Sequence, residues 1–193
     1  EKEKKKLIKL KKQGVETTID NGATYLELIY LSKVYAQTQI EKYKTAYLKG
    51  IDYLLVAQYE NGGWPQFYPL KTGYYTHITY NDNAMINTLL ILREVAAGGG
   101  KLIPVNDKIT IEKAQKAYEK GIECILKTQY IQNGELSVWC AQHDEKTFHP
   151  AKARAYELPS LSGSESAGIV LFLMNIENPS PEVIKSVNAA VRW

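Results

Sequence analysis

Apolar residues recur with helical spacing after two similar polar openings. Segment 18–23 reads TIDNGA and precedes apolar residues at Leu26, Leu28, Leu31 and Val34. Segment 79–84 reads TYNDNA and precedes apolar residues at Ile86, Leu89, Leu92 and Val95. This spacing places the apolar side chains on one face of a helix. The pattern therefore predicts two related helices, each beginning after a polar turn.

A second pair of segments repeats in the same way. Residues 43–59 and 114–130 share an alanine, a tyrosine, Lys-Gly-Ile, a leucine and Gln-Tyr at identical spacing. Each segment is followed by Asn-Gly and then by a tryptophan, Trp64 or Trp139. Because Asn-Gly favours a turn, each unit is predicted to be a helix, a turn, a second helix and an aromatic loop.

A third copy follows but is shorter. Segment 162–167, SGSESA, precedes the apolar run 168–173, and Pro181 opens a further helix that reaches Trp193. Three hairpins of this kind predict an all-α fold, an (α/α)3 toroid in which long loops at one end form a cleft. Polar helix starts that satisfy free backbone donors would gather at that same end. A two-layer solenoid with the same repeats is the alternative.

Composition narrows the class of protein. The 193 residues contain 24 Lys plus Arg against 21 Asp plus Glu, a net charge of +3, and much of the excess lies in residues 1–12. We therefore expect no nucleic-acid partner. No segment is apolar for long enough to span a membrane, and none resembles a signal peptide. We expect either a basic N-terminal extension or a lead-in to the first helix at 1–16, and one domain at 17–193, whose third hairpin is incomplete.

The tract 61–69, NGGWPQFYP, is too rich in Gly and Pro to be a regular helix. We predict that Trp64, Gln66 and Tyr68 form one wall of a polymer-binding cleft, because flat aromatic faces stack on sugar rings. An aromatic plug between two helices is the alternative.

Four motifs in order resemble one known family. They are NGGWPQFYP at 61–69, ITYNDNAM at 78–85, WCAQHD at 139–144 and AKARAYE at 151–157. Together they resemble the calcium-dependent pectate lyases of polysaccharide lyase family 10, from about residue 17 to 193. The resemblance implies an (α/α)3 toroid that cleaves polygalacturonate by β-elimination, leaving 4,5-unsaturated oligogalacturonates. It also implies a bacterial, secreted or periplasmic protein, and we expect a monomer.

Elimination next to a uronate carboxylate requires that negative charge be neutralised, which Ca²⁺ does through oxygen ligands. The resemblance makes Asp144 a calcium ligand, and it makes Asp82 both a calcium ligand and a catalytic residue that assists calcium. Asp82 has a structural alternative, because Thr79 and Asp82 have the spacing of a capping box. Asp144 could instead pair with Lys146. We interpret Asp20 as a helix cap.

Basic and imidazole groups are candidates for contacts with the polymer. Lys152 and Arg154 could bind a uronate carboxylate, and the planar guanidinium could do so with two hydrogen bonds. Alternatively, Arg154 pairs with Glu157 or Glu165. His77 lies near the aromatic tract and is predicted to contact sugar.

The resemblance also implies an arginine base for the C5 proton. The chain contains only Arg93, Arg154 and Arg192, none in the matching place, so we expect the base to lie beyond Trp193. Little lyase activity is then expected from the chain alone. Two alternatives are a pectin-binding fragment without catalysis and an α/α-toroid hydrolase that uses paired carboxylates.

Overall fold

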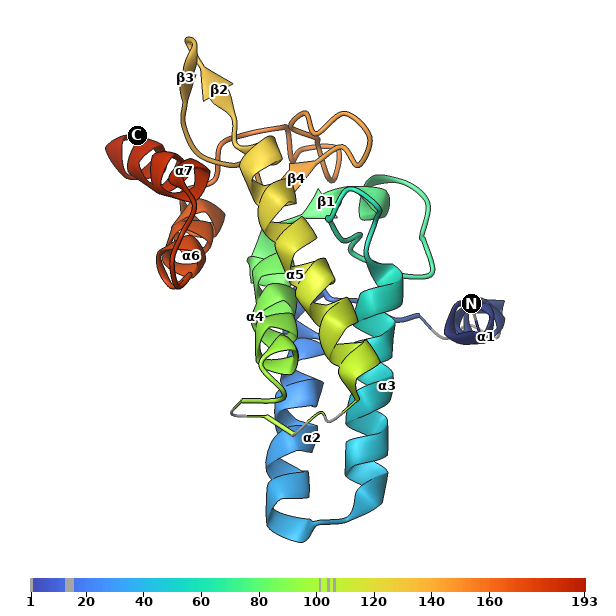
Figure 1. Ribbon diagram of the computed structural model, residues 1–193. Helices are drawn as coiled ribbons and strands as arrows, with labels where there is room; N and C mark the ends of the chain where they lie inside the picture. The colour runs from blue at the N-terminus through green and yellow to red at the C-terminus, as the bar shows by residue number, and fades with distance from the viewer. Residues whose placement is uncertain (1, 13–15, 101, 104, 106) are drawn as a thin grey trace.

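The computed structural model describes residues 2–12, 16–100, 102–103, 105 and 107–193. Its α-helices are α1 (Lys2–Lys12), α2 (Tyr25–Thr38), α3 (Glu41–Ala57), α4 (Ala84–Ala96), α5 (Lys108–Thr128), α6 (Gly163–Met174) and α7 (Pro181–Arg192). The pairs α2–α3, α4–α5 and α6–α7 each pack as a hairpin (Figure 1). The predicted all-α class and the three hairpins are confirmed for this part of the chain.

The hairpins stack side by side in two layers. Helix α4 contacts both α2 and α6, while α5 contacts both α3 and α7 (Figure 1). The first helix of each hairpin therefore lies in one layer and the second helix in the other. Helix α4 lies in the middle, and eight of its residues are buried. Closure of the layers into a toroid stays a prediction.

A repeated glycine allows the two helices of each of the first two hairpins to pack closely. A Cβ at Gly50 would lie 2.6 Å from Leu28 Cδ2, and one at Gly121 would lie 2.4 Å from Leu89 Cδ2. Any side chain at these positions would collide with the buried leucine of the partner helix. The Lys-Gly-Ile repeat therefore reflects close helix packing within each hairpin.

The two repeated tryptophans donate hydrogen bonds to carbonyl groups at the C-terminal ends of helices. Trp64 Nε1 donates to Leu54 O at 2.8 Å, and Trp139 Nε1 donates to Ile125 O at 2.8 Å. The acceptors lie in the last turns of α3 and α5, where carbonyls have no partner within the helix. Both rings are completely buried. The prediction that Trp64 stacks on sugar is therefore wrong in this structure, because neither face of its ring is accessible.

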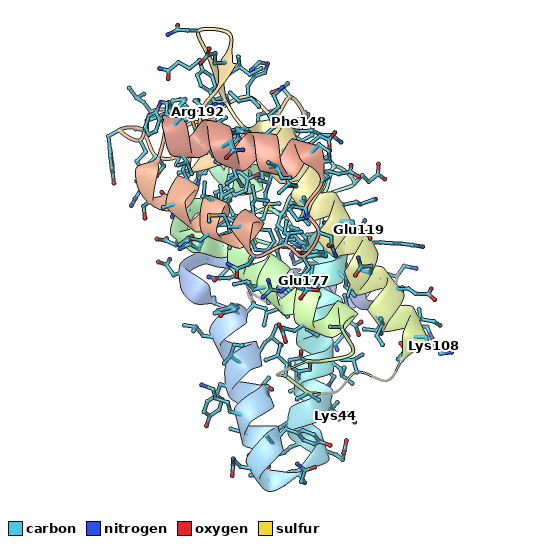
Figure 2. All side chains as sticks on the ribbon, turned by 60° about the vertical axis from the view of Figure 1, so that its left-hand side comes forward. Lys44, Lys108, Glu119, Phe148, Glu177 and Arg192 are labelled. Atoms are coloured by element: carbon cyan, nitrogen blue, oxygen red, sulfur yellow. The ribbon has the colours of Figure 1, made fainter. Side chains whose placement is uncertain are left out.

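A layer of loops and short strands covers one end of the helices. Strand β1 (Ile78–Thr79) pairs antiparallel with β4 (Gln142–His143), and β2 (Ile131–Gln132) pairs with β3 (Glu135–Leu136). Isolated bridges join Thr18 to Phe67 and Cys140 to Leu161. Each polar helix opening is thus tied to an aromatic loop. Figure 2 shows Phe148 within this layer and Lys44 at the opposite end of the molecule.

Helix α1 lies beside α3, outside the three hairpins (Figure 1). Among the described residues, no helix has both the length and the apolar character needed to cross a bilayer.

Candidate active site

The loop layer forms an open cavity of about 620 Å³. Its lining comes from both polar openings, the aromatic tract and the loops at 141–142 and 151–160. The polar and charged side chains among the lining residues are Asp20, Asn21, Gln66, Tyr74, Asn81, Asp82, Gln142, Arg154, Tyr156, Glu157 and Ser160. This size is in the range of small-ligand sites, and the cavity is the candidate functional site.

Two short 3₁₀ turns, η1 (Asp20–Gly22) and η3 (Asn81–Asn83), contact each other beside the cavity. The second residue of each turn has nearly the same backbone conformation. Asn21 has φ 52° and ψ 32°, and Asp82 has φ 53° and ψ 28°. Asn and Asp tolerate this left-handed region better than most residues. The repeated turn therefore places one aspartate from each opening at the cavity, although the order of acid and amide is exchanged.

Asp82 does not cap α4. The N-cap residue is Asn83, and no side chain caps the helix there. The capping-box interpretation is therefore wrong. The Asp82 carboxylate accepts a 2.7 Å bond from Asn81 Nδ2 at Oδ2. Burial first, and then the charges of Asp20 and Glu165, raise the pKa of Asp82.

Asp20 is a cavity residue that the sequence interpretation missed. It caps no helix, because the N-cap residue of α2 is Thr24, again without a side-chain bond. Its Oδ2 accepts from Asn21 Nδ2 at 3.0 Å. Its Oδ1 is buried and accepts no hydrogen bond from the residues that the structure describes. The signal that could have revealed Asp20 is the repeat, since 18–23 and 79–84 each carry an acid in the same turn.

Asp144 immediately follows strand β4. Its Oδ1 accepts from Lys146 N at 3.0 Å, Thr147 N at 2.8 Å and Thr147 Oγ1 at 2.9 Å. The Thr147 amide is the main cause that lowers the pKa of Asp144. Asp144 is not among the residues that line the cavity. Its carboxylate lies near His77 instead.

His77, Asp144 and Glu145 offer ligand atoms that lie within 4.8 Å of one another. Within this group, His77 Nδ1 lies 3.3 Å from Glu145 Oε2. His77 therefore has a protein partner in the structure, and its contact with sugar stays a prediction.

Arg154 lines the cavity and is paired. Its Nε donates to Glu157 Oε2 at 2.8 Å, and its Nη2 donates to Glu157 Oε1. The guanidinium also lies 5.4 Å from the ring centre of Tyr156. Of the two interpretations of Arg154, the structure shows the pairing with Glu157. Lys152 is exposed and is not a lining residue.

The aromatic tract contributes to the cavity mainly through Gln66. Gln66 is only 6% exposed and lines the cavity, whereas Tyr68 is half-buried against the core. The sequence interpretation also missed Tyr74, Gln142 and Tyr156, which line the cavity. Gln142 and Tyr156 lie within the motifs at 139–144 and 151–157, but the positions of the loops decide which side chains of a motif face the cavity.

The fold and site define an all-α protein of stacked helical hairpins with an acidic cavity among its loops. A model of the pectic acid lyase family matches residues 1–193, and the chain belongs to this family.

Two solved structures of a family 10 polysaccharide lyase from Cellvibrio cellulosa are similar to this chain. One is an aspartate-to-alanine mutant in complex with trigalacturonic acid, and the other is described simply as the family 10 lyase. Each has 44% sequence identity and a TM-score of 0.86 over 92% of this chain. The chain spans 56% of the first structure's length and 55% of the second's. A search of curated proteins found no match.

Proposed function

We propose that this chain forms the substrate cleft of a calcium-dependent pectate lyase. The enzyme would cleave polygalacturonate by β-elimination and leave 4,5-unsaturated oligogalacturonates. The family membership supports this proposal, as does the trigalacturonic acid bound to the mutant of the Cellvibrio cellulosa lyase. The same family supports a secreted bacterial protein.

The charge of the cavity is the observation that carries the proposal. Asp20, Asp82 and Glu157 line it, and Arg154 is the only cationic side chain among its lining residues. Arg154 is already paired with Glu157. A polymer of carboxylates would be repelled by such a surface unless a cation lay between the two. The charges of the lining residues therefore support dependence on a cation.

The residues fit calcium rather than a softer metal. The cavity presents carboxylate and amide oxygens, which are the ligands that Ca²⁺ prefers. Partial desolvation of Asp82, together with the nearby charges of Asp20 and Glu165, makes its ionisation less favourable without a counter-ion, in line with its raised pKa. Asp82 would contact an ion in the cavity, and Asp144 would hold an ion beside His77 and Glu145, outside the cavity lining. When bound, calcium would neutralise the substrate carboxylate as charge develops at the neighbouring carbon.

The remaining side chains would orient the polymer. Gln66 lines the cavity and could hydrogen-bond a uronate through its amide. Arg154 could exchange Glu157 for a substrate carboxylate, because both are acceptors for its planar donors. Tyr68, His77 and Lys152 would extend the contacts beyond the cavity.

Affinity electrophoresis in gels that contain polygalacturonate tests the proposal directly. We expect retardation of the protein in calcium, loss of retardation with a chelator, and weaker retardation for Asp82→Asn and Asp144→Asn. Retardation that a chelator leaves unchanged would overturn the calcium-dependent cleft.

Product analysis separates the alternatives. Ultraviolet absorbance by unsaturated uronates identifies a lyase. Saturated products formed without calcium would identify a hydrolase that uses paired carboxylates and would refute the lyase.

A further inference from the structure

We propose that Asp20 is a further ligand of the divalent cation at Asp82. The inference rests on the proposed function, because it concerns the same cavity. It assigns a metal-binding role to a residue whose sequence context suggests only a helix cap.

The first argument is the geometry of the two turns. η1 and η3 contact each other, so the two repeats present their carboxylates to one cavity. Each aspartate has its Oδ2 bonded to the amide of the adjacent asparagine, at 3.0 Å for Asp20 and 2.7 Å for Asp82. Both carboxylates are thus held in place by the same kind of contact, and neither side chain caps a helix.

The second argument is the lack of donors around the buried oxygens. Asp20 Oδ1, Gln66 Oε1 and Gln142 Oε1 are buried and accept no hydrogen bond from the residues that the structure describes. Gln66 is 6% exposed and Gln142 is 5% exposed, and all three residues line the cavity. A buried carboxylate oxygen without a donor is costly. An oxygen-coordinating cation would satisfy it.

The third argument is the sum of the charges. Asp20 and Asp82 line the same cavity, and Glu165 lies in the first turn of α6, which contacts η3, so acids from the starts of three repeats lie close together. A sugar hydroxyl could donate a hydrogen bond to Asp20 but would leave the negative charge in place. A divalent cation both supplies a ligand contact and neutralises charge, so the site favours the cation.

The repeat also provides conservative variants. Asn81 occupies in η3 the position of Asp20 in η1, and Asn21 occupies the left-handed position of Asp82. Asp20→Asn and Asp82→Asn therefore place asparagine where the same turn already accepts it. Glu177→Gln serves as a control, because it removes one carboxylate from an exposed residue between α6 and α7 (Figure 2).

Calorimetric titration of the metal-free protein with Ca²⁺ alone tests the assignment. We expect Asp20→Asn to lower calcium affinity by at least about tenfold, since loss even of an outer-shell partner has an effect of that size. Glu177→Gln should leave the affinity unchanged. If the Asp20→Asn variant binds Ca²⁺ with the wild-type affinity, the inference is wrong.

Thermal unfolding provides a second readout that a merely structural role would not reproduce. In a chelator, Asp20→Asn should melt at or above the wild-type temperature, because it removes an uncompensated charge. In saturating calcium it should melt below wild type, because a ligand that binds the native state stabilises it. An equal loss of stability in both conditions would assign Asp20 to the turn alone and overturn the proposal.

The results also separate this inference from the proposed function. If the wild-type protein binds no calcium, the proposed calcium dependence itself is wrong. If Asp82→Asn weakens calcium binding and Asp20→Asn does not, only the inference about Asp20 is wrong. If Asp20→Asn binds calcium normally but binds polygalacturonate more weakly, Asp20 contacts the sugar and the proposed metal role is wrong.

Discussion

Replacement of Trp64 by phenylalanine should destabilise the protein without changing the cleft directly. The indole N–H donates to Leu54 O at 2.8 Å, and the ring is completely buried. Loss of the donor leaves a buried carbonyl without a partner, at a cost of about 1–3 kcal/mol. The smaller ring leaves about 40 Å³ unfilled, which adds about 1 kcal/mol at roughly 24 cal/mol per Å³. The expected loss in free energy of unfolding is therefore about 2–4 kcal/mol.

For a chain of this length, such a loss lowers the melting temperature by roughly 4–16 °C. Circular dichroism during heating measures the shift, and urea unfolding gives the free energy. Trp193→Phe is the matched control, because its indole is 57% exposed and bonds Gln132 at the surface. That variant should stay within about 0.5 kcal/mol of wild type. If the Trp64→Phe protein kept wild-type stability but bound polygalacturonate more weakly, this reasoning would be refuted. Trp64 would then be expected to stack on the sugar after all.

Two further predictions concern charged side chains. Glu157→Gln should strengthen calcium-dependent polygalacturonate retardation in affinity gels, because it removes a negative charge from the cavity and releases Arg154; weaker retardation would contradict this. Asp107→Ala should lower the melting temperature by about 2–4 °C, because the carboxylate caps α5 at Ile109 N and Thr110 N. Hydrogen bonds from Thr110 lower the pKa of Asp107, so the difference from wild type should persist at neutral pH and shrink as pH falls below about 4. A difference that is unchanged at low pH would argue against the charged cap.

Much of the fold follows from local patterns. The helical spacing after 18–23 and 79–84 predicted the first helix of each hairpin, and α2 and α4 begin at Tyr25 and Ala84. The Lys-Gly-Ile repeat predicted the second helix of each hairpin. These predictions held because a helix is stabilised by contacts between residues three and four apart, which a single segment displays in full.

The site was predictable only in part. The motifs placed Gln66, Asp82 and Arg154 in a cleft, and the structure finds all three in one cavity. The ionic partner of Arg154 was left open between two possibilities. Trp64 was wrongly predicted to face the substrate. An indole can stack on a sugar, but it can equally be buried and donate a hydrogen bond to a helix end.

By itself, the sequence determined the helices, their pairing into hairpins and the family of the chain, because each depends on residues close together or on motifs in a fixed order. Only the tertiary structure decided that Trp64 caps a helix, that Arg154 pairs with Glu157 and that Asp20 lies beside Asp82. Asp20 and Asp82 are separated by an entire hairpin. Their proximity depends on how two hairpins stack, which no local pattern encodes.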